Sequence, residues 1–212
     1  MEITITNNES EWLAVREGRF TASDIHKLMG TPRNKSEYLS ETAKSFVYEK
    51  ASELLTGIRK PIWGEALTWG TENEKEAFEY FQQHQDDFYT YYGGETYTFI
   101  PYGEYSGYSP DALGSTCLVE IKNPFNSGIH LKNRSIVDAE TLLKIHPEYY
   151  WQMQLGMIAS AVDFGYFVSY DKRMPDTHKL FISHIECEDV KETIDEKLYY
   201  ANDLLQSIVK LM

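Results

Sequence analysis

Two short motifs near the middle of the chain combine residue types that can hydrolyse a bond. Ser109-Pro110-Asp111 is followed, after a short gap, by Glu120-Ile121-Lys122. Two carboxylates and an amine can together hold a divalent cation and orient a water molecule. A turn aspartate beside a surface ion pair would give the same spacing. The choice between these alternatives depends on the elements that carry the two motifs.

The second motif ends a stretch that predicts a β-strand over residues 117–122. Most residues of this stretch are β-formers, and the side chains of a strand alternate between the two faces of a sheet. Val119 and Ile121 should therefore point one way. Glu120 and Lys122 should point the other way, which costs free energy on an apolar strand unless something uses their charges. A bound cation and a polarised water would use both.

A third carboxylate lies on the apolar face of a predicted helix over residues 65–83. Steps of three and four residues place Glu74 on the apolar stripe that runs from Leu67 to Phe81. The other acids of this helix are expected to be solvated. A buried salt bridge would satisfy Glu74, and so would a metal ion shared with Asp111 and Glu120.

The order of the predicted elements indicates an α/β (α+β) fold with a central mixed β-sheet flanked by helices. Helices are expected over residues 12–17, 21–30, 36–56, 65–83, 136–145, 148–161 and 190–211. Strands are expected over residues 88–92, 97–101, 105–108, 117–122, 164–170 and 180–185. No linker, repeat or low-complexity tract interrupts the 212 residues, so we expect a single domain over residues 1–212.

Charge and composition limit the function classes. A net charge of −13 argues against a protein that coats nucleic acid over its whole surface, although a local basic channel is compatible with it. The first residues lack the features of a signal peptide, and no stretch approaches a membrane span. A cytoplasmic protein without membrane contact is therefore expected. Cys117 and Cys187 form no zinc or disulfide pattern and are expected to be reduced, packed thiols.

Several further segments extend the two motifs. In chain order they are Trp12–Arg16 with Thr21-Ala22-Ser23, Ala66–Gly70 with Glu74, Ser109-Pro110-Asp111, Glu120–Phe125, Gln152-Met153-Gln154 and Tyr170–Met174. In this order they resemble the phage lambda exonuclease and YqaJ-type viral recombinase family, a branch of the PD-(D/E)XK nuclease superfamily. The resemblance covers residues 12–174, most of the chain.

The resemblance implies a metal-dependent exonuclease on a PD-(D/E)XK core. Such an enzyme degrades one strand of linear double-stranded DNA from its 5′ end to mononucleotides and leaves a 3′ single-stranded tail. It also implies work beside a single-strand annealing protein in phage-type recombination, inside a bacterial host cell. A ring-shaped homotrimer is suggested by the family, although nothing in the sequence shows an interface.

The resemblance assigns roles to individual residues. The implied metal ligands are Glu74, Asp111, Glu120 and the backbone carbonyl of Ile121. Lys122 would orient or deprotonate the attacking water, with Gln154 close to it, and the 5′ phosphate would be held by Arg16, Ser23 and Ser109. A ligand set made only of oxygen suits Mg²⁺ or Mn²⁺, and two ions per active site can support an in-line displacement. We expect Lys122 to orient the water and stabilise charge, because the nearby acids favour its protonated form.

The chain departs from the family at two positions that bear on DNA. Gly128 lies where the lambda enzyme has an arginine at the phosphate end, and Glu65 replaces a lysine near the DNA path. His130, Lys132 and Arg134 are candidate substitutes. These departures leave the strength of the 5′-phosphate preference and the processivity open.

Two other functions are compatible with the same motifs. One is a different PD-(D/E)XK DNA endonuclease, structure-specific or of the restriction type. The other is a DNA-binding module that has lost catalysis, which the retained acids and Lys122 disfavour. A nuclease with an iron–sulfur cluster is disfavoured because two cysteines cannot supply four thiolates.

Overall fold

A computed structural model of the chain describes residues 3–59, 64–94 and 96–210. Within these ranges a five-stranded sheet forms the centre of the fold, in the strand order β3-β6-β7-β8-β9. Its strands are β3 (Thr90–Tyr91), β6 (Ala112–Leu113), β7 (Cys117–Lys122), β8 (Phe164–Tyr170) and β9 (Leu180–Glu186). β7 and β8 are parallel and the other neighbours are antiparallel. This confirms the predicted central mixed sheet.

A second, smaller sheet was not predicted. It has the order β1-β4-β5-β2, with β1 (Thr4–Ile5), β4 (Thr98–Tyr102), β5 (Ser106–Tyr108) and β2 (Phe20–Thr21). The strands expected over residues 97–101 and 105–108 belong to this sheet and do not lead directly into β7. Of the tyrosine-rich segments only β3, which is two residues long, pairs within the central sheet.

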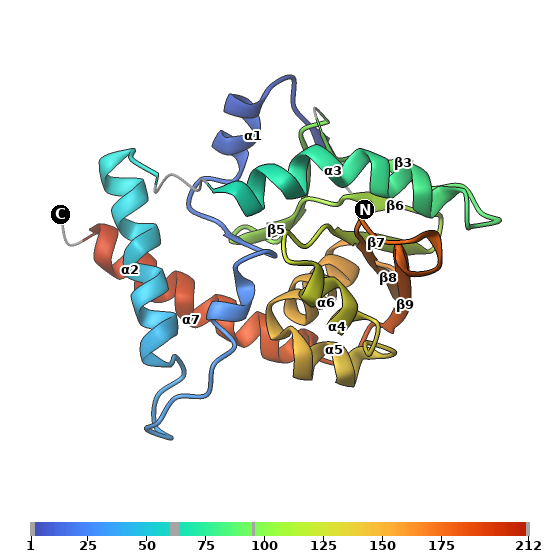
Figure 1. Cartoon of the computed structure of the whole chain (residues 1–212). Coiled ribbons are helices and arrows are strands. Elements are labelled where there is room, and N and C mark those ends of the chain that lie inside the picture. Colours follow the sequence, from blue (N-terminus) through green and yellow to red (C-terminus); the bar gives the residue numbers. More distant parts are fainter. Residues whose placement is uncertain (1–2, 60–63, 95, 211–212) are drawn as a thin grey trace.

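Helices cover both faces of the central sheet (Figure 1). On one face lies α3 (Glu65–Gln82), and on the other lie α4 (Ser127–Asn133), α5 (Ala139–Ile145) and α6 (Pro147–Ser160). Beyond the smaller sheet, α2 (Glu41–Thr56) packs against α7 (Lys191–Lys210), and α1 (Glu9–Val15) precedes β2. The layered α/β/α arrangement places the strand ends of the central sheet between two helical layers.

The helices differ from the sequence predictions in several places, besides shifts of about three residues at the starts of α1 and α5. Residues 21–30 hold the end of β2 and a 3₁₀ turn, η1 (Ile25–Lys27), in place of a helix. Pairing of β2 with β5 accounts for this, because a tertiary contact outweighs a local capping pattern. α4 was not predicted, and α2 begins after an N-cap at Ser40, later than expected. The predicted end of the last helix at Leu211 lies outside the described residues.

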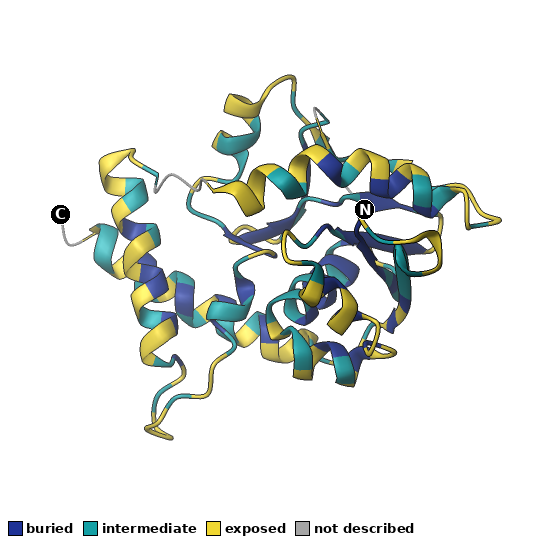
Figure 2. Cartoon of the chain, in the orientation of Figure 1, coloured by how far each residue is buried: buried dark blue, intermediate teal, exposed yellow. Residues whose placement is uncertain are grey.

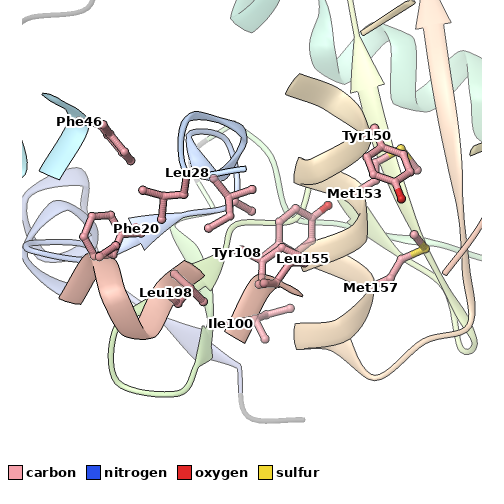
Figure 3. Packing of buried hydrophobic residues seen from close by; sticks show 14 of the residues in the cluster. Phe20, Leu28, Phe46, Ile100, Tyr108, Tyr150, Met153, Leu155, Met157 and Leu198 are labelled. Carbon is pink, nitrogen blue, oxygen red and sulfur yellow. The ribbon is translucent and has the colours of Figure 1, made fainter. Parts of the chain in front are cut away.

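The core has two parts, one on each face of the central sheet. The part under α3 consists of Ala77, Phe78, Phe81, Ala112, Val119, Ile121, Val168 and Tyr170. The larger part lies under α6 and extends to α7, and Figure 3 shows Met153, Leu155 and Leu198 within it. Figure 2 shows the buried residues concentrated in the strands and on the helix faces that cover them.

The burial of β7 follows the predicted alternation. Val119 and Ile121 pack in the part of the core under α3, and Leu118 packs in the part under α6. Glu120 therefore shares the α6 face with Leu118, as the period of a strand requires. The apolar stripe of α3 is shorter than predicted, because Leu67 at its start is 50% exposed.

Among the described residues, no helix combines the length and the apolar character needed to cross a lipid bilayer. Cys117 is buried, Cys187 is half-buried, and both thiols are free, as predicted.

Candidate active site

Glu120 is held in place by donors from three elements. Its side chain is 1% exposed. Oε1 accepts hydrogen bonds from Nζ of Lys122 at 2.6 Å and from Nε2 of Gln152 on α6 at 2.6 Å. Oε2 accepts a hydrogen bond from the hydroxyl of Tyr108 on β5 at 2.9 Å. The carboxylate therefore has a fixed orientation before any ligand binds.

Asp111 lies at the start of β6, beside the end of β7. Its Oδ2 accepts a hydrogen bond from the backbone N–H of Ile121 at 2.7 Å. The antiparallel register of β6 and β7 pairs Ala112 with Val119, which brings the residue before Ala112 to the level of Glu120, next to Ile121. The sheet itself thus unites the two sequence motifs. Asp111 is half-buried.

Glu74 reaches the same region from α3. Its Oε1 accepts a hydrogen bond from the hydroxyl of Tyr91 on β3 at 3.0 Å. The backbone after β3 passes so close to this carboxylate that a Cβ at Gly93 would lie 1.8 Å from Oε1 of Glu74. A glycine is required there because any side chain would displace the carboxylate.

The three carboxylates act on one another electrostatically. Burial raises the pKa of Asp111 well above its ordinary value, and the charges of Glu120 and Glu74 raise it further. Burial also raises the pKa of Glu74, and Glu120 adds to this, although the Tyr91 hydroxyl opposes it. The cluster therefore holds more negative charge than Lys122 alone can balance.

The charge state of Lys122 follows from the same neighbours. Burial would lower the pKa of its amine, but the charges of Glu120 and Asp111 outweigh burial and raise that pKa above its ordinary value. The ammonium lies over the ring of Tyr149, with Nζ 4.8 Å from the ring centroid. Lys122 is therefore a protonated donor, which agrees with an orienting role more than with proton abstraction.

The donor set fits a hard divalent cation. In the described ranges no three acidic, histidine or cysteine side chains converge to enclose an ion by themselves. Mg²⁺ does not need such a cage, because it usually takes one or two carboxylates together with waters and substrate phosphate oxygens. Burial and, after it, mutual repulsion raise the pKa of Asp111 and Glu74, and a bound cation would offset both effects. Glu74, Asp111, Glu120 and the Ile121 carbonyl thus remain candidate ligands.

Gln154 does not lie beside Lys122, contrary to the sequence prediction. It is fully buried, and its Nε2 donates to the Glu186 carbonyl at 2.9 Å while its Oε1 accepts from the Glu188 N–H at 2.8 Å. It ties α6 to the end of β9. Gln152 contacts Glu120 and has Oε1 3.4 Å from Nζ of Lys122.

Helical spacing could have distinguished the two glutamines. Residues two apart on a helix point to nearly opposite sides, whereas residues three apart share a face. Gln152 shares a face with Tyr149, the residue over Lys122. Gln154, the glutamine predicted from the sequence, shares a face with Tyr150, which lies in the core.

A second polar group lies at the end of α1. Nη1 of Arg16 donates to Oγ of Ser109 at 3.0 Å, and Nε1 of Trp12 donates to the same oxygen at 3.2 Å. The Arg16 guanidinium also stacks over the Trp12 ring, 4.0 Å from its centroid. The structure therefore brings together two of the three residues expected to anchor a 5′ phosphate, and one of them, Ser109, precedes Asp111 by two residues.

Two further residues surround this group. Ser23, the third expected anchor, is exposed, and its hydroxyl lies 3.3 Å from Oγ1 of Thr21. Arg59 was not singled out from the sequence, and it donates to the Leu13 carbonyl near the end of α1. Burial lowers the pKa of Arg16 to about 10, and the nearby Arg59 charge contributes to this. Two cations thus lie close to one another at this helix end.

The candidate substitutes for an arginine at Gly128 differ in availability. His130 is fully buried and bonds to Oγ of Ser169 at 2.9 Å, so it cannot contact DNA. Lys132 and Arg134 are exposed on or next to α4. Glu65 is exposed in the first turn of α3.

Known structures share this fold. An alkaline exonuclease (LHK-Exo) from Laribacter hongkongensis matches with a TM-score of 0.78 and 28% sequence identity over 95% of both chains. The structure of LHK-Exo in complex with dAMP matches with a TM-score of 0.78 and 29% identity, again over 95% of both chains. A phage related exonuclease from Haemophilus somnus 129PT shares the fold, with a TM-score of 0.77 and 17% identity over 92% of this chain and 96% of that chain.

No curated protein matches the sequence of this chain. The family model for the YqaJ-like viral recombinase domain matches residues 11–163. That range is most of the chain and contains Arg16, Glu74, Asp111, Glu120 and Lys122. The resemblance inferred from the motifs is thereby confirmed, and the chain belongs to the YqaJ-like viral recombinase family.

Proposed function

We propose that this phage-type exonuclease degrades one strand of linear duplex DNA from its 5′ end, releases mononucleotides and leaves a 3′ single-stranded tail. The observation that carries the proposal is the geometry at the end of β7, where Nζ of Lys122 lies 2.6 Å from Oε1 of Glu120 and Asp111 accepts from the Ile121 N–H at 2.7 Å. The carboxylates of Glu120 and Glu74 both act on the pKa of Asp111 there. A purely binding protein would gain nothing from acids that face a polyanion. The LHK-Exo relative has been crystallised with dAMP, a mononucleotide.

The residues of the cluster have distinct proposed roles. Glu74, Asp111, Glu120 and the Ile121 carbonyl would hold Mg²⁺ or Mn²⁺, two ions per site, which would supply an activated water and neutralise charge on the phosphate. Lys122 donates hydrogen bonds to the attacking water and to the charge that develops on the phosphate. Gln152 takes the place expected of Gln154 and holds Glu120 and Lys122 in register.

The group at the end of α1 is the proposed anchor for the DNA end. Arg16 and Ser109 offer a cation and a hydroxyl within 3.0 Å of one another, and Arg59 adds a second cation nearby. Ser23, exposed after β2, is the further proposed ligand. Guanidinium groups and hydroxyls are common ligands of phosphate. The arrangement supports a preference for 5′-phosphorylated ends.

The wider setting is also a proposal. We expect residues 1–212 to act as one nuclease domain in the cytoplasm of a bacterial host, beside a single-strand annealing protein that takes up the 3′ tail. A homotrimer around duplex DNA would suit the reaction. These expectations come from the family resemblance.

One experiment tests the proposed reaction. Linear duplex labelled at either the 5′ or the 3′ end is incubated with the protein and Mg²⁺, next to a closed circular duplex of the same sequence. We expect early release of the 5′ label as a mononucleotide, late loss of the 3′ label and an intact circle. Early release of the 3′ label would refute the direction, and cutting of the circle would favour an endonuclease. Lys122→Ala serves as the control without turnover.

A further inference from the structure

A buried chain of hydrogen bonds connects α4, β8 and the start of α6, close to the candidate active site. It begins at the His178 carbonyl, which lies 2.8 Å from Nε2 of His130. Nδ1 of His130 lies 2.9 Å from Oγ of Ser169, and Nδ2 of Asn133 donates to the same oxygen at 3.0 Å. Oδ1 of Asn133 lies 2.9 Å from Nε2 of His146. The chain thus links β8 and α4 to the start of α6.

The hydrogen-bonding groups of this chain have defined directions. A carbonyl can only accept, so Nε2 of His130 carries a proton and its Nδ1 accepts from the Ser169 hydroxyl. The amide of Asn133 donates to Ser169 through Nδ2 and accepts from His146 through Oδ1. His130, Asn133 and Ser169 are each at most 1% exposed. A satisfied buried network of this kind fixes the groups at its ends.

One end of the chain reaches the ring that covers Lys122. The His146 ring packs on the Tyr149 ring, with centroids 4.9 Å apart, and Tyr149 also packs on Phe167 at 5.9 Å. Nζ of Lys122 lies 4.8 Å from the Tyr149 centroid, a distance typical of a cation–π contact. Ser169, in the middle of the chain, is the β8 neighbour of Lys122 in the parallel register.

We propose that Tyr149 is a positioning residue whose ring holds the Lys122 ammonium toward Glu120 and Gln152, and that the chain from His130 to His146 keeps this ring in place. A lysine has four rotatable bonds in its stem, and its two hydrogen-bonding contacts leave the direction of approach open. The Tyr149 ring, on α6, restricts the conformations that the Lys122 side chain can adopt. The inference rests on the role proposed for Lys122 in hydrolysis.

The first test separates the ring from the hydroxyl. Tyr149→Phe keeps the ring and should retain turnover within about twofold of the wild type. Tyr149→Leu removes the ring, and kcat on 5′-phosphorylated linear duplex should fall about tenfold, the size of a partly desolvated cation–π contact. KM should stay within about twofold, because the Tyr149 ring packs on Lys122, His146 and Phe167, whereas the proposed anchor of the DNA end consists of Arg16 and Ser109. Tyr199→Leu, a change of an exposed tyrosine on α7, is the matched control and should be silent.

The second test needs no DNA and therefore survives a failure of the proposed function. Thermal melting is measured without metal for the wild type, Tyr149→Leu, Lys122→Met and the double variant. If the ring and the ammonium interact, Tyr149→Leu lowers Tm more in the wild type than in the Lys122→Met background. Equal losses in the two backgrounds would overturn the pairing. A normal kcat for Tyr149→Leu would overturn the positioning role even if the pairing is found.

The third test asks whether the buried chain acts through the ring. Asn133→Ala breaks the chain in its middle and should lower kcat about threefold with KM unchanged. In the Tyr149→Leu background the same change should have no further effect on kcat, because the ring that it supports is absent. An equal loss in both backgrounds would show that the chain does not act through Tyr149.

Discussion

Two aspartates next to strands β6 and β8, which flank β7 in the central sheet, have opposite electrostatic surroundings. Asp171, after β8, accepts hydrogen bonds from Nε of Arg173 at 2.8 Å, from Nη2 of Arg173 at 2.9 Å and from Oγ of Ser127 at 2.7 Å. Burial alone would raise its pKa, but these donors lower the pKa of Asp171 to about 2. Asp111 has one backbone donor and two acidic neighbours, and its pKa is raised.

The comparison shows that the partners of a buried acid decide the direction of its pKa shift. Burial raises the pKa of both carboxyls, yet only the pKa of Asp171 ends below its ordinary value. Asp171 has the Arg173 guanidinium and the Ser127 hydroxyl as donors, whereas the one nearby ammonium of Asp111, Lys122, is shared with Glu120 and Glu74. The first pattern is typical of a structural acid and the second of a functional one.

The largest expected contrast is in catalysis. Asp111→Asn and Lys122→Ala should each lower the rate of DNA cleavage by about a thousandfold or more, since charge stabilisation at a metal site contributes several kcal/mol. Asp171→Asn should cleave at close to the wild-type rate at a temperature where it is folded. End-labelled duplex and single-turnover conditions measure all three. A strongly reduced cleavage rate in a folded Asp171→Asn variant would contradict the expected difference in catalysis between the two aspartates.

The second expected contrast between the two aspartates is in stabilisation by bound metal. Mg²⁺ or Mn²⁺ at a hundred times its Kd should stabilise the wild type by about 3 kcal/mol, and a chelator should reverse the effect. The stabilisation should be lost in Asp111→Asn and kept in Asp171→Asn. Melting curves over a metal titration provide the measurement. An unchanged titration in Asp111→Asn would refute its assignment as a ligand.

The two aspartate substitutions should change the stability of the metal-free protein in opposite directions. Asp171→Asn should lower the free energy of unfolding by about 2 kcal/mol, the value that corresponds to a pKa near 2 in the folded state. Asp111→Asn should raise it, because the substitution removes a charge that burial, Glu120 and Glu74 oppose. Urea unfolding at neutral pH compares the two variants. Destabilisation by both changes would contradict the assignment of Asp111 as an unbalanced charge.

The pH dependence of stability has opposite signs at the two sites. The folded pKa of Asp171 lies below its unfolded value, so its contribution is present above about pH 4 and is lost as the pH falls toward 2. The folded pKa values of Asp111 and Glu74 lie above their unfolded values, so the stability they contribute is complete below about pH 4 and is lost as the pH rises. Unfolding of the metal-free protein between pH 3 and 8 tests both signs.

The smallest expected contrast lies between the two glutamines of α6. Gln152→Ala removes a donor to the charged Glu120 and should lower kcat roughly tenfold with little change in Tm. Gln154→Ala leaves the Glu186 carbonyl and the Glu188 N–H without partners and should lower Tm with little change in kcat. A lower kcat for Gln154→Ala together with a lower Tm for Gln152→Ala would instead support the sequence-based placement of Gln154 beside Lys122.

The sequence predicted what depends on local periodicity. The alternation along β7 placed Glu120 and Lys122 on one face, and the helical period placed Glu74 toward the core, and the structure agrees with both. The sequence predicted β4 and β5 as strands but could not predict the smaller sheet that they join, because β2 is too short to show a period and its partner β5 is distant in the chain. The same limit applies to His130, whose buried partner Ser169 lies on another element.

The link between Ser109 and Asp111 has a consequence for the products of the proposed reaction. Pro110 fixes one backbone angle and restricts the residue before it to extended conformations, so this link is stiff. Two extended residues span about 7 Å, which sets a constant separation between the proposed anchor of the DNA end and the acid at the scissile bond. A stiff spacer of this kind is a molecular ruler, and each cut is then measured from the end of the strand.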